Sequence, residues 1–276
     1  MQTAFRELAD GPHELAVNLS AGGITYLASL AAGWKSVLRM EPVGCRSRRA
    51  ALFSLPHRAL RRVPILRGLP ARLMAGAASL SRPLSGLDRA RARGAGRITP
   101  TIVVETAPRP EAMAELVARL PYDGRIRHVR DARYLSWRYQ NPMYEYRFLY
   151  REMEGGVGGY LALQADRTAR WPGRLWIVDW EAAAEAVRRE LLEAVLRCGG
   201  FAELAVWSST VGPETRGTLE SRGFRPVDVE RTSRGYPCLL VRPIRRGPPL
   251  QERSVGGRPL LDRESWDLRM IYSMHG

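Results

Sequence analysis

The sequence predicts an α/β fold in which a mixed, largely antiparallel sheet is flanked by helices. Short runs of bulky apolar residues, typical of buried strands, alternate with segments whose apolar side chains recur at helical spacing. Within residues 174–224 the order is strand, helix, strand, helix, with short turns between them. Because parallel strands need a crossover connection, this order predicts a parallel pair covered by helices within the sheet.

The predicted elements follow the apolar pattern along the chain. Strands are expected at residues 13–19, 35–40, 101–105, 144–151, 158–164, 174–180, 201–207, 225–229 and 237–243. Helices are expected at residues 1–10, 24–32, 110–120, 131–139, 181–198 and 213–221. We expect a flexible loop at residues 247–257 and a final packed segment at residues 266–270.

The order of elements near the N-terminus indicates an internal duplication. There, a helix ended by Gly33-Trp34 lies between two strands, as the helix ended by Gly223-Phe224 does later in the chain. We therefore expect four parts, which are a partial first lobe without its early strands (1–45), an arginine-rich helical linker (46–98), a compact α/β domain (99–245) and a tail packed on that domain (246–276).

The positive charge of the chain is concentrated in one segment. The net charge is +15, and arginine supplies 42 of the 43 basic residues. Residues 46–97 hold thirteen arginines and one acid, so this segment alone carries +12. We favour a helical connector whose apolar side packs on the next domain, and the alternative is a surface that docks on anionic lipid or nucleic acid. Nucleic acid ranks last, because no recognition motif accompanies the charge.

Three further observations bound the class of protein. Cys45, Cys198 and Cys238 are far apart and form no C-x-x-C pair, so we expect no disulfide framework and no metal site. The N-terminus is acidic, unlike the basic start of a signal peptide. The uncharged run 15–34 is too polar for a membrane span. We expect a cytoplasmic protein, with peripheral attachment to the inner membrane face as an additional expectation.

Two phrases in the sequence resemble those of a known superfamily. They are RDARYLSWRYQNP at residues 130–142 and LESRGF at residues 219–224. Together with the order of elements, they resemble the GNAT superfamily of acyl-CoA-dependent N-acyltransferases. The first phrase is similar to one in two-lobed members from bacterial polysaccharide biosynthesis clusters, and the second resembles the signature Y-E-K-x-G-F.

The resemblance implies an activity and a cofactor. A GNAT protein would transfer an acyl group such as acetyl from acyl-CoA to an amine, here an amine of a sugar or cell-envelope precursor. In the superfamily, the cofactor's diphosphate rests on a glycine-rich loop at the N-terminus of the central helix. The matching contacts to acetyl-CoA would come from Val178, Ala183, Ala186 and Arg188.

The sequence departs from the superfamily pattern at this loop. The pattern [RQ]-x-x-G-x-[GA] is not present, because no glycine lies between Trp180 and Gly199. Glu181 and Glu185 also bring negative charge to a place where an anion would bind. We therefore expect a degraded or incomplete acyl-CoA site.

Candidate catalytic and acceptor residues remain. Asp179 and Glu181 are the candidate general bases, and desolvation would raise the pKa of an aspartate between Val178 and Trp180. The competing interpretation, which we favour, makes Asp179 a helix N-cap. The aromatic residues that would shape an acceptor pocket are Tyr134, Trp137 and Tyr139.

Two functions from different classes follow. The first is an N-acyltransferase that acts on a small-molecule or glycan amine, with acyl-CoA or another acyl donor. The second is a non-catalytic binding module that attaches to an anionic membrane or polymer through its arginine-rich segment.

Overall fold

A computed structural model describes residues 10–21, 23–47, 83–167, 173–227, 238–245 and 247–273. All but the last residue of the helix expected at residues 1–10, and most of the arginine-rich linker, lie outside the described residues.

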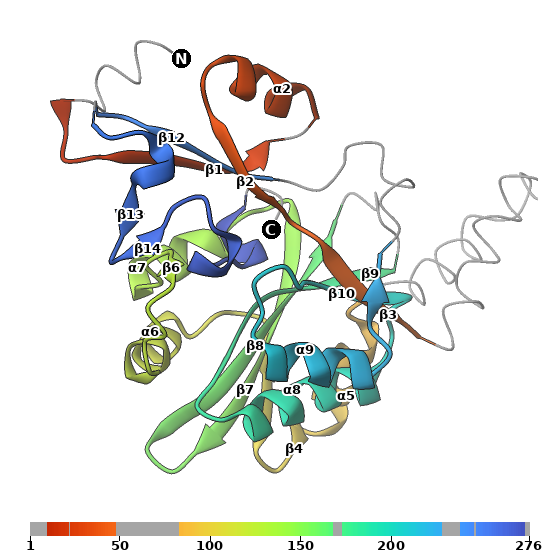
Figure 1. The fold of residues 1–276 in the computed structure, drawn as a ribbon. Coiled ribbons are helices and arrows are strands. Elements are labelled where there is room, and N and C mark those ends of the chain that lie inside the picture. Colours follow the sequence, from red (N-terminus) through yellow and green to blue (C-terminus); the bar gives the residue numbers. More distant parts are fainter. Residues whose placement is uncertain are drawn as a thin grey trace, which may run out of the picture.

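The main element is an eight-stranded mixed sheet (Figure 1). Its strands in spatial order are β11 (Arg225–Pro226), β3 (Pro42–Arg46), β10 (Glu203–Trp207), β9 (Arg174–Ala182), β8 (Gly156–Asp166), β7 (Tyr144–Met153), β5 (Ile102–Glu105) and β4 (Arg97–Thr99). Within this sheet β9 and β10 pair in parallel, and the other described pairs are antiparallel. The predicted fold class, a mixed and largely antiparallel sheet flanked by helices, is confirmed.

Helices cover both faces of this sheet, because each face is apolar. On one face lie α5 (Ser85–Arg93), α8 (Glu185–Cys198) and α9 (Pro213–Ser221), and the core beneath them includes Leu87, Leu191 and Leu219. On the other face lie α6 (Pro110–Arg119), α7 (Ala132–Arg138) and the C-terminal segment. That segment contains η2 (Leu250–Glu252), β13 (Ser254–Val255), β14 (Arg258–Pro259), η3 (Arg263–Ser265), β15 (Trp266–Asp267) and η4 (Met270–Tyr272), and β15 pairs with β6 (Ile126–Arg127).

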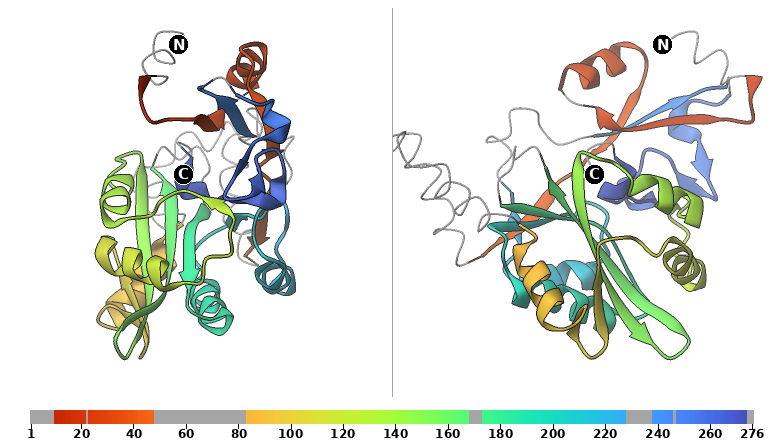
Figure 2. Two further views of the ribbon diagram at one scale, coloured as in Figure 1. Left: turned by 60° about the vertical axis from the view of Figure 1, so that its left-hand side comes forward. Right: turned by 180° about the vertical axis from the view of Figure 1, so that it is seen from behind.

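A second, smaller sheet is built from both ends of the chain. Its order is β1 (Leu15–Ala21), β12 (Cys238–Pro243) and β2 (Lys35–Arg39), all antiparallel, and α2 (Gly23–Ala31) connects β1 to β2. Figure 2 shows this sheet stacked beyond the end of the large one, with β3 running from the small sheet into the large sheet.

Both sheets contain the same unit of two strands joined by a helix, with a third strand between them. In each unit this third strand comes from the other end of the chain. In the large sheet β3 lies between β10 and β11, and in the small sheet β12 lies between β1 and β2. Each outer pair is joined by one helix, α9 or α2, followed by a glycine with positive φ, Gly223 or Gly33. The N-terminal segment thus completes the C-terminal arrangement, and the C-terminal strand completes the N-terminal one.

A β-bulge separates β9 from β10 at one end. On the β8 side, Ile177 pairs with Leu163 and Asp179 with Ala162, so Val178 is an extra residue in β9. Pairing between β9 and β10 ends at Ile177 and Val206. Because a bulge bends and twists its strand, β9 diverges from β10 beyond this point.

The structure corrects three expectations. Strand β9 continues to Ala182 and α8 begins at Glu185, so the expected helix start at residue 181 is wrong. Asp179 is not a helix N-cap, because it lies within β9 and Ala184 is the N-cap residue of α8. Residues 247–257, expected as a flexible loop, include η2 and β13 within the described residues.

Candidate functional site

A cavity of about 210 Å³ lies where β9 and β10 diverge. Its walls come from the end of β9, from the connection between β10 and α9, and from the C-terminal segment. The lining residues are Arg125, Ile177, Val178, Asp179, Trp180, Arg188, Val206, Trp207, Thr210, Val211, Gly212, Thr215, Asp267, Leu268, Arg269 and Met270. Ligands of α/β sheets bind at such strand ends, so this cavity is the candidate site.

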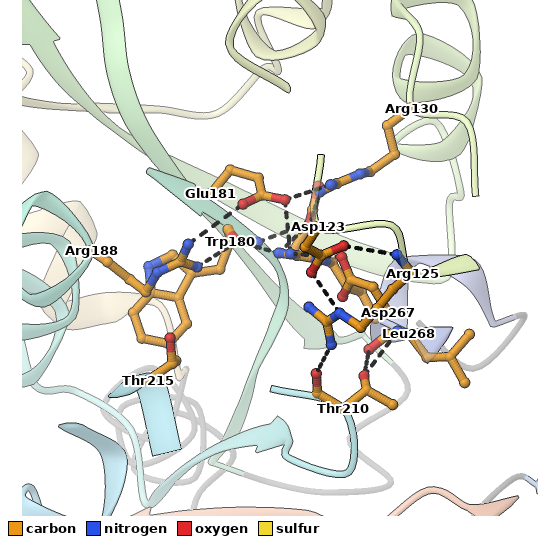
Figure 3. Close-up of polar contacts among 12 residues, drawn as sticks. Asp123, Arg125, Arg130, Trp180, Glu181, Arg188, Thr210, Thr215, Asp267 and Leu268 are labelled. Carbon is orange, nitrogen blue, oxygen red and sulfur yellow. Dashed lines mark hydrogen bonds and ion pairs between the residues drawn. The ribbon is translucent and has the colours of Figure 1, made fainter. Parts of the chain in front are cut away.

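The C-terminal segment is tied into the cavity wall. The Thr210 hydroxyl donates to the Leu268 carbonyl oxygen and accepts from the Leu268 amide, both at 2.9 Å. Arg125 donates to the Thr210 carbonyl oxygen at 2.6 Å. Leu268 and Met270 are each 5% exposed. The segment predicted as packed at residues 266–270 therefore forms one side of the site (Figure 3).

Asp179 is buried and both of its carboxylate oxygens are occupied. Arg130 donates to Oδ1 at 2.9 Å, and the Tyr160 hydroxyl donates to Oδ2 at 2.6 Å. The Trp180 amide also donates to Oδ1 at 3.0 Å, and Arg269 lies 3.5 Å from the same oxygen. The carboxylate of Asp179 therefore has no oxygen left for a further partner among the described side chains.

Glu181 has an equally complete set of partners. Its Oε1 accepts from Arg130 at 2.5 Å and pairs with Arg269 at 2.8 Å, and its Oε2 lies 3.6 Å from Arg188. Burial opposes the charge, but the attraction of these guanidinium groups prevails and lowers the pKa of Glu181. The carboxylate is therefore charged over the whole neutral range.

Arg269 joins the carboxylates to the C-terminal segment. It pairs with Glu181, and with Asp267 at 3.3 Å, and it donates to the Trp180 carbonyl oxygen. The attraction of Arg269 and Arg125 lowers the pKa of the buried Asp267 against the effect of desolvation. We call Arg130, Arg269, Asp179, Glu181 and Asp267 the buried charge cluster.

The predicted cofactor residues are not gathered at one site. Val178 is buried and lines the cavity, and Arg188 lines it from α8. Arg188 is already engaged, because it donates to the Trp180 carbonyl oxygen at 3.1 Å and pairs with Glu185 at 3.0 Å. Ala183 and Ala186 are exposed outside the cavity.

The start of α8 carries a carboxylate and has no glycine loop before it. Glu185 occupies the first turn, and its carboxylate accepts from the hydroxyls of Thr215 and Thr218, each at 3.3 Å. A carboxylate at the positive end of a helix is stabilised there and repels a second anion. The two residues before Glu185 carry methyl side chains in place of a glycine loop, so the backbone approach that such a loop gives is restricted.

The three aromatic residues expected at an acceptor pocket lie in different surroundings. Tyr139 is 8% exposed and packs edge-on against Phe148 in the core. Tyr134 donates its hydroxyl to the Ile271 carbonyl oxygen at 3.0 Å, and Trp137, beside it, is 63% exposed. The walls of the cavity between β9 and β10 do not include these residues.

The sequence analysis did not identify Arg130, Arg269 and Asp267 of the buried charge cluster. Arg130 belongs to the phrase at residues 130–142, but no role was assigned to it. Arg269 and Asp267 lie in the otherwise apolar segment 266–271, and this pattern could have identified them as part of a site. Charged residues in a buried segment need partners, so they pointed to opposite charges elsewhere in the core.

The chain resembles solved structures at the level of the fold. No protein-family model matches the sequence, and no curated protein matches it. A GCN5-related N-acetyltransferase from Anabaena variabilis covers 88% of this chain at 12% identity with a TM-score of 0.48. A GCN5-related N-acetyltransferase from Kribbella flavida covers 88% of this chain at 12% identity with a TM-score of 0.44. A tandem GNAT protein from the clavulanic acid biosynthesis pathway covers 89% of this chain at 13% identity with a TM-score of 0.41.

This chain spans 49%, 47% and 69% of those three chains, so it has about half the length of the first two. Among the described residues, no helix is long and apolar enough to cross a membrane. In the same part of the chain, no cluster of three or more His, Cys, Asp and Glu residues has the geometry to hold a metal ion.

Proposed function

We propose that the chain is an N-acyltransferase-related protein whose acyl-CoA site is degraded, and that its cavity binds a small ligand without acyl transfer from CoA. The observation that carries the proposal is the pairing of Asp179 and Glu181 with the buried Arg130 and the partly buried Arg269. A general base works best when its pKa lies near the operating pH. Glu181 has a lowered pKa, and protonating it would take a counter-charge away from the buried Arg130 and the partly buried Arg269.

Two further features support the same proposal. Glu185 at the start of α8 is unfavourable for a diphosphate, as argued above. The cavity of about 210 Å³ is also smaller than the ~300–1,000 Å³ typical of pockets for drug-sized ligands. A small molecule with an apolar part suits walls made by residues such as Val178, Val206 and Met270.

The second candidate is transfer of an acetyl group to an amine of a sugar or cell-envelope precursor. The divergence of β9 from β10 favours it, because this opening leads to a cavity beside two carboxylates. If transfer occurs with Asp179 and Glu181 fully paired, the acceptor amine must arrive already neutral. The rate would then rise with pH up to the pKa of the amine, without an inflection from a carboxylate.

One assay separates the two candidates. The chain is incubated with acetyl-CoA and glucosamine, and release of free thiol is followed over time, with Glu181→Gln as the comparison. We expect no release above the uncatalysed rate for either form. Saturable release of thiol by the wild type would contradict the proposal, and saturable release that a folded Glu181→Gln variant keeps would support transfer to an amine that arrives neutral.

A further inference from the structure

Helix α2 presents an apolar face to the outside of the small sheet. The helix contains no charged residue, and Ile24, Leu27 and Leu30 are 89%, 67% and 37% exposed. These residues recur at every third position and so lie along one side of the helix. A helix that faces water normally carries polar residues on that side. We call these three residues the α2 apolar face.

The chain contains an internal control for this face, which is α9. When Gly33-Trp34 is matched to Gly223-Phe224, Ser29 matches Leu219, and both are buried, at 4% and 1% exposure. The positions of the α2 apolar face are then occupied in α9 by Glu214, Gly217 and Glu220, all exposed. The exposed side of this helix therefore carries polar or small residues in α9 and large apolar residues in α2.

We propose that the α2 apolar face docks on an anionic lipid surface. A lipid surface offers both an apolar phase for Ile24 and Leu27 and negative charge for a chain whose net charge is +15. Nucleic acid would satisfy the charge but not these apolar side chains. A second copy of this chain would bring another net charge of +15 into contact with the first. Three side chains also cover much less area than the ~800 Å² that each partner buries in a standard protein–protein interface.

The position of α2 allows this docking without closing the cavity. Figures 1 and 2 show α2 on the outer side of the small sheet, at the opposite end of the molecule from α5 and α8. The residues that line the cavity come from other elements. The inference is thus independent of the function proposed for the cavity.

Vesicle co-sedimentation of the full chain tests the inference. Vesicles of phosphatidylcholine with phosphatidylglycerol are compared with vesicles of phosphatidylcholine alone, at low and high salt. We expect binding to the anionic vesicles that weakens as salt is added. The double variant Ile24→Ser, Leu27→Ser should lower the partition coefficient by about tenfold or more, because two apolar side chains no longer enter the lipid.

The matched control removes two exposed apolar side chains elsewhere, as Met143→Ser, Val255→Ser, which are 52% and 46% exposed in the wild type. This control should bind within about twofold of the wild type, and both variants should keep the wild-type circular dichroism spectrum and melting midpoint. Equal binding by the α2 variant and the wild type would overturn the inference. So would a wild-type dimer, measured by light scattering, that the α2 variant alone dissociates, because a second copy would then cover the face.

Discussion

At the residue scale, the pairing of charges decides what the site can do. Asp179 and Glu181 could be singled out from the sequence, because two acids beside Trp180 stand at the end of an apolar strand. Their partners could not be identified from the sequence, because they are distant along the chain. Arg130 lies 49 residues before Asp179, beside an expected helix, and Arg269 lies 88 residues after Glu181, in the expected tail. A desolvated acid and a paired acid have the same sequence signature, yet their pKa values shift in opposite directions.

Removing one cation of the buried charge cluster should destabilise the fold. We expect Arg269→Ala to lower the free energy of unfolding by about 3–5 kcal/mol, because Glu181 and Asp267 would keep their buried charge without this partner. Urea denaturation measures the change. The control Arg133→Ala removes an exposed arginine and should change stability by less than about 0.5 kcal/mol. Equal effects of the two substitutions would show that the cluster contributes nothing specific.

The buried charge cluster should make the free energy of unfolding depend on pH in the acid range. The pKa values of Glu181 and Asp267 are lowered in the folded state relative to the unfolded chain, where they are about 4. Their contribution is therefore fully present above about pH 5 and is lost as the pH falls through the folded-state values. Denaturation between pH 7 and pH 3 should show a steeper loss for the wild type than for Asp267→Asn. Parallel curves would contradict the lowered pKa of Asp267.

At the element scale, the bulge at Val178 makes the cavity, and it was not predictable from the sequence. The run 174–180 predicts a strand but carries no mark of an extra residue. The helix start was misplaced for a related reason. Glu181 and Glu185 are both typical of a first helical turn, and the pairing of Ala182 with Gly159 of β8 extends the strand past the first of them.

The contact between α5 and α8 depends on a glycine. A Cβ at Gly86 would clash with the carbonyl oxygens of Cys198 and Gly199 at the end of α8. We expect Gly86→Ala to lower the free energy of unfolding by about 1–3 kcal/mol, measured by thermal and urea denaturation. The same change at Gly217 of α9, which has no heavy atom within 4 Å of a Cβ, should be neutral or stabilise by up to about 1 kcal/mol. A stable Gly86→Ala variant would mean that α5 does not pack as described.

At the scale of the whole molecule, the exchange of β3 and β12 joins the two sheets. The repeated order of elements near Gly33 and Gly223 is visible in the sequence, and it indicated a duplication. The exchange is not visible there, because either strand has the composition to pair in either sheet. The boundaries expected at residues 45 and 245 stay a prediction, and the strands at residues 42–46 and 238–243 each lie in the other part's sheet.

This exchange predicts that the molecule unfolds as one unit. Loss of one part of the molecule would remove β12 from the small sheet or β3 from the large sheet, so calorimetry should give one transition with equal calorimetric and van't Hoff enthalpies. Leu240→Ala in β12 should lower the melting temperature as seen by probes in both sheets. Two separate transitions, or an effect confined to the small sheet, would contradict this coupling.

We propose that this chain is related to N-acyltransferases and that its site does not accept acyl-CoA. Calorimetric titration of the folded chain with acetyl-CoA up to millimolar concentration tests this proposal most directly. We predict no saturable heat, because Glu185 occupies the positive end of α8. Saturable binding that strengthens in Glu185→Gln would contradict the claim and show that the helix end still receives the diphosphate.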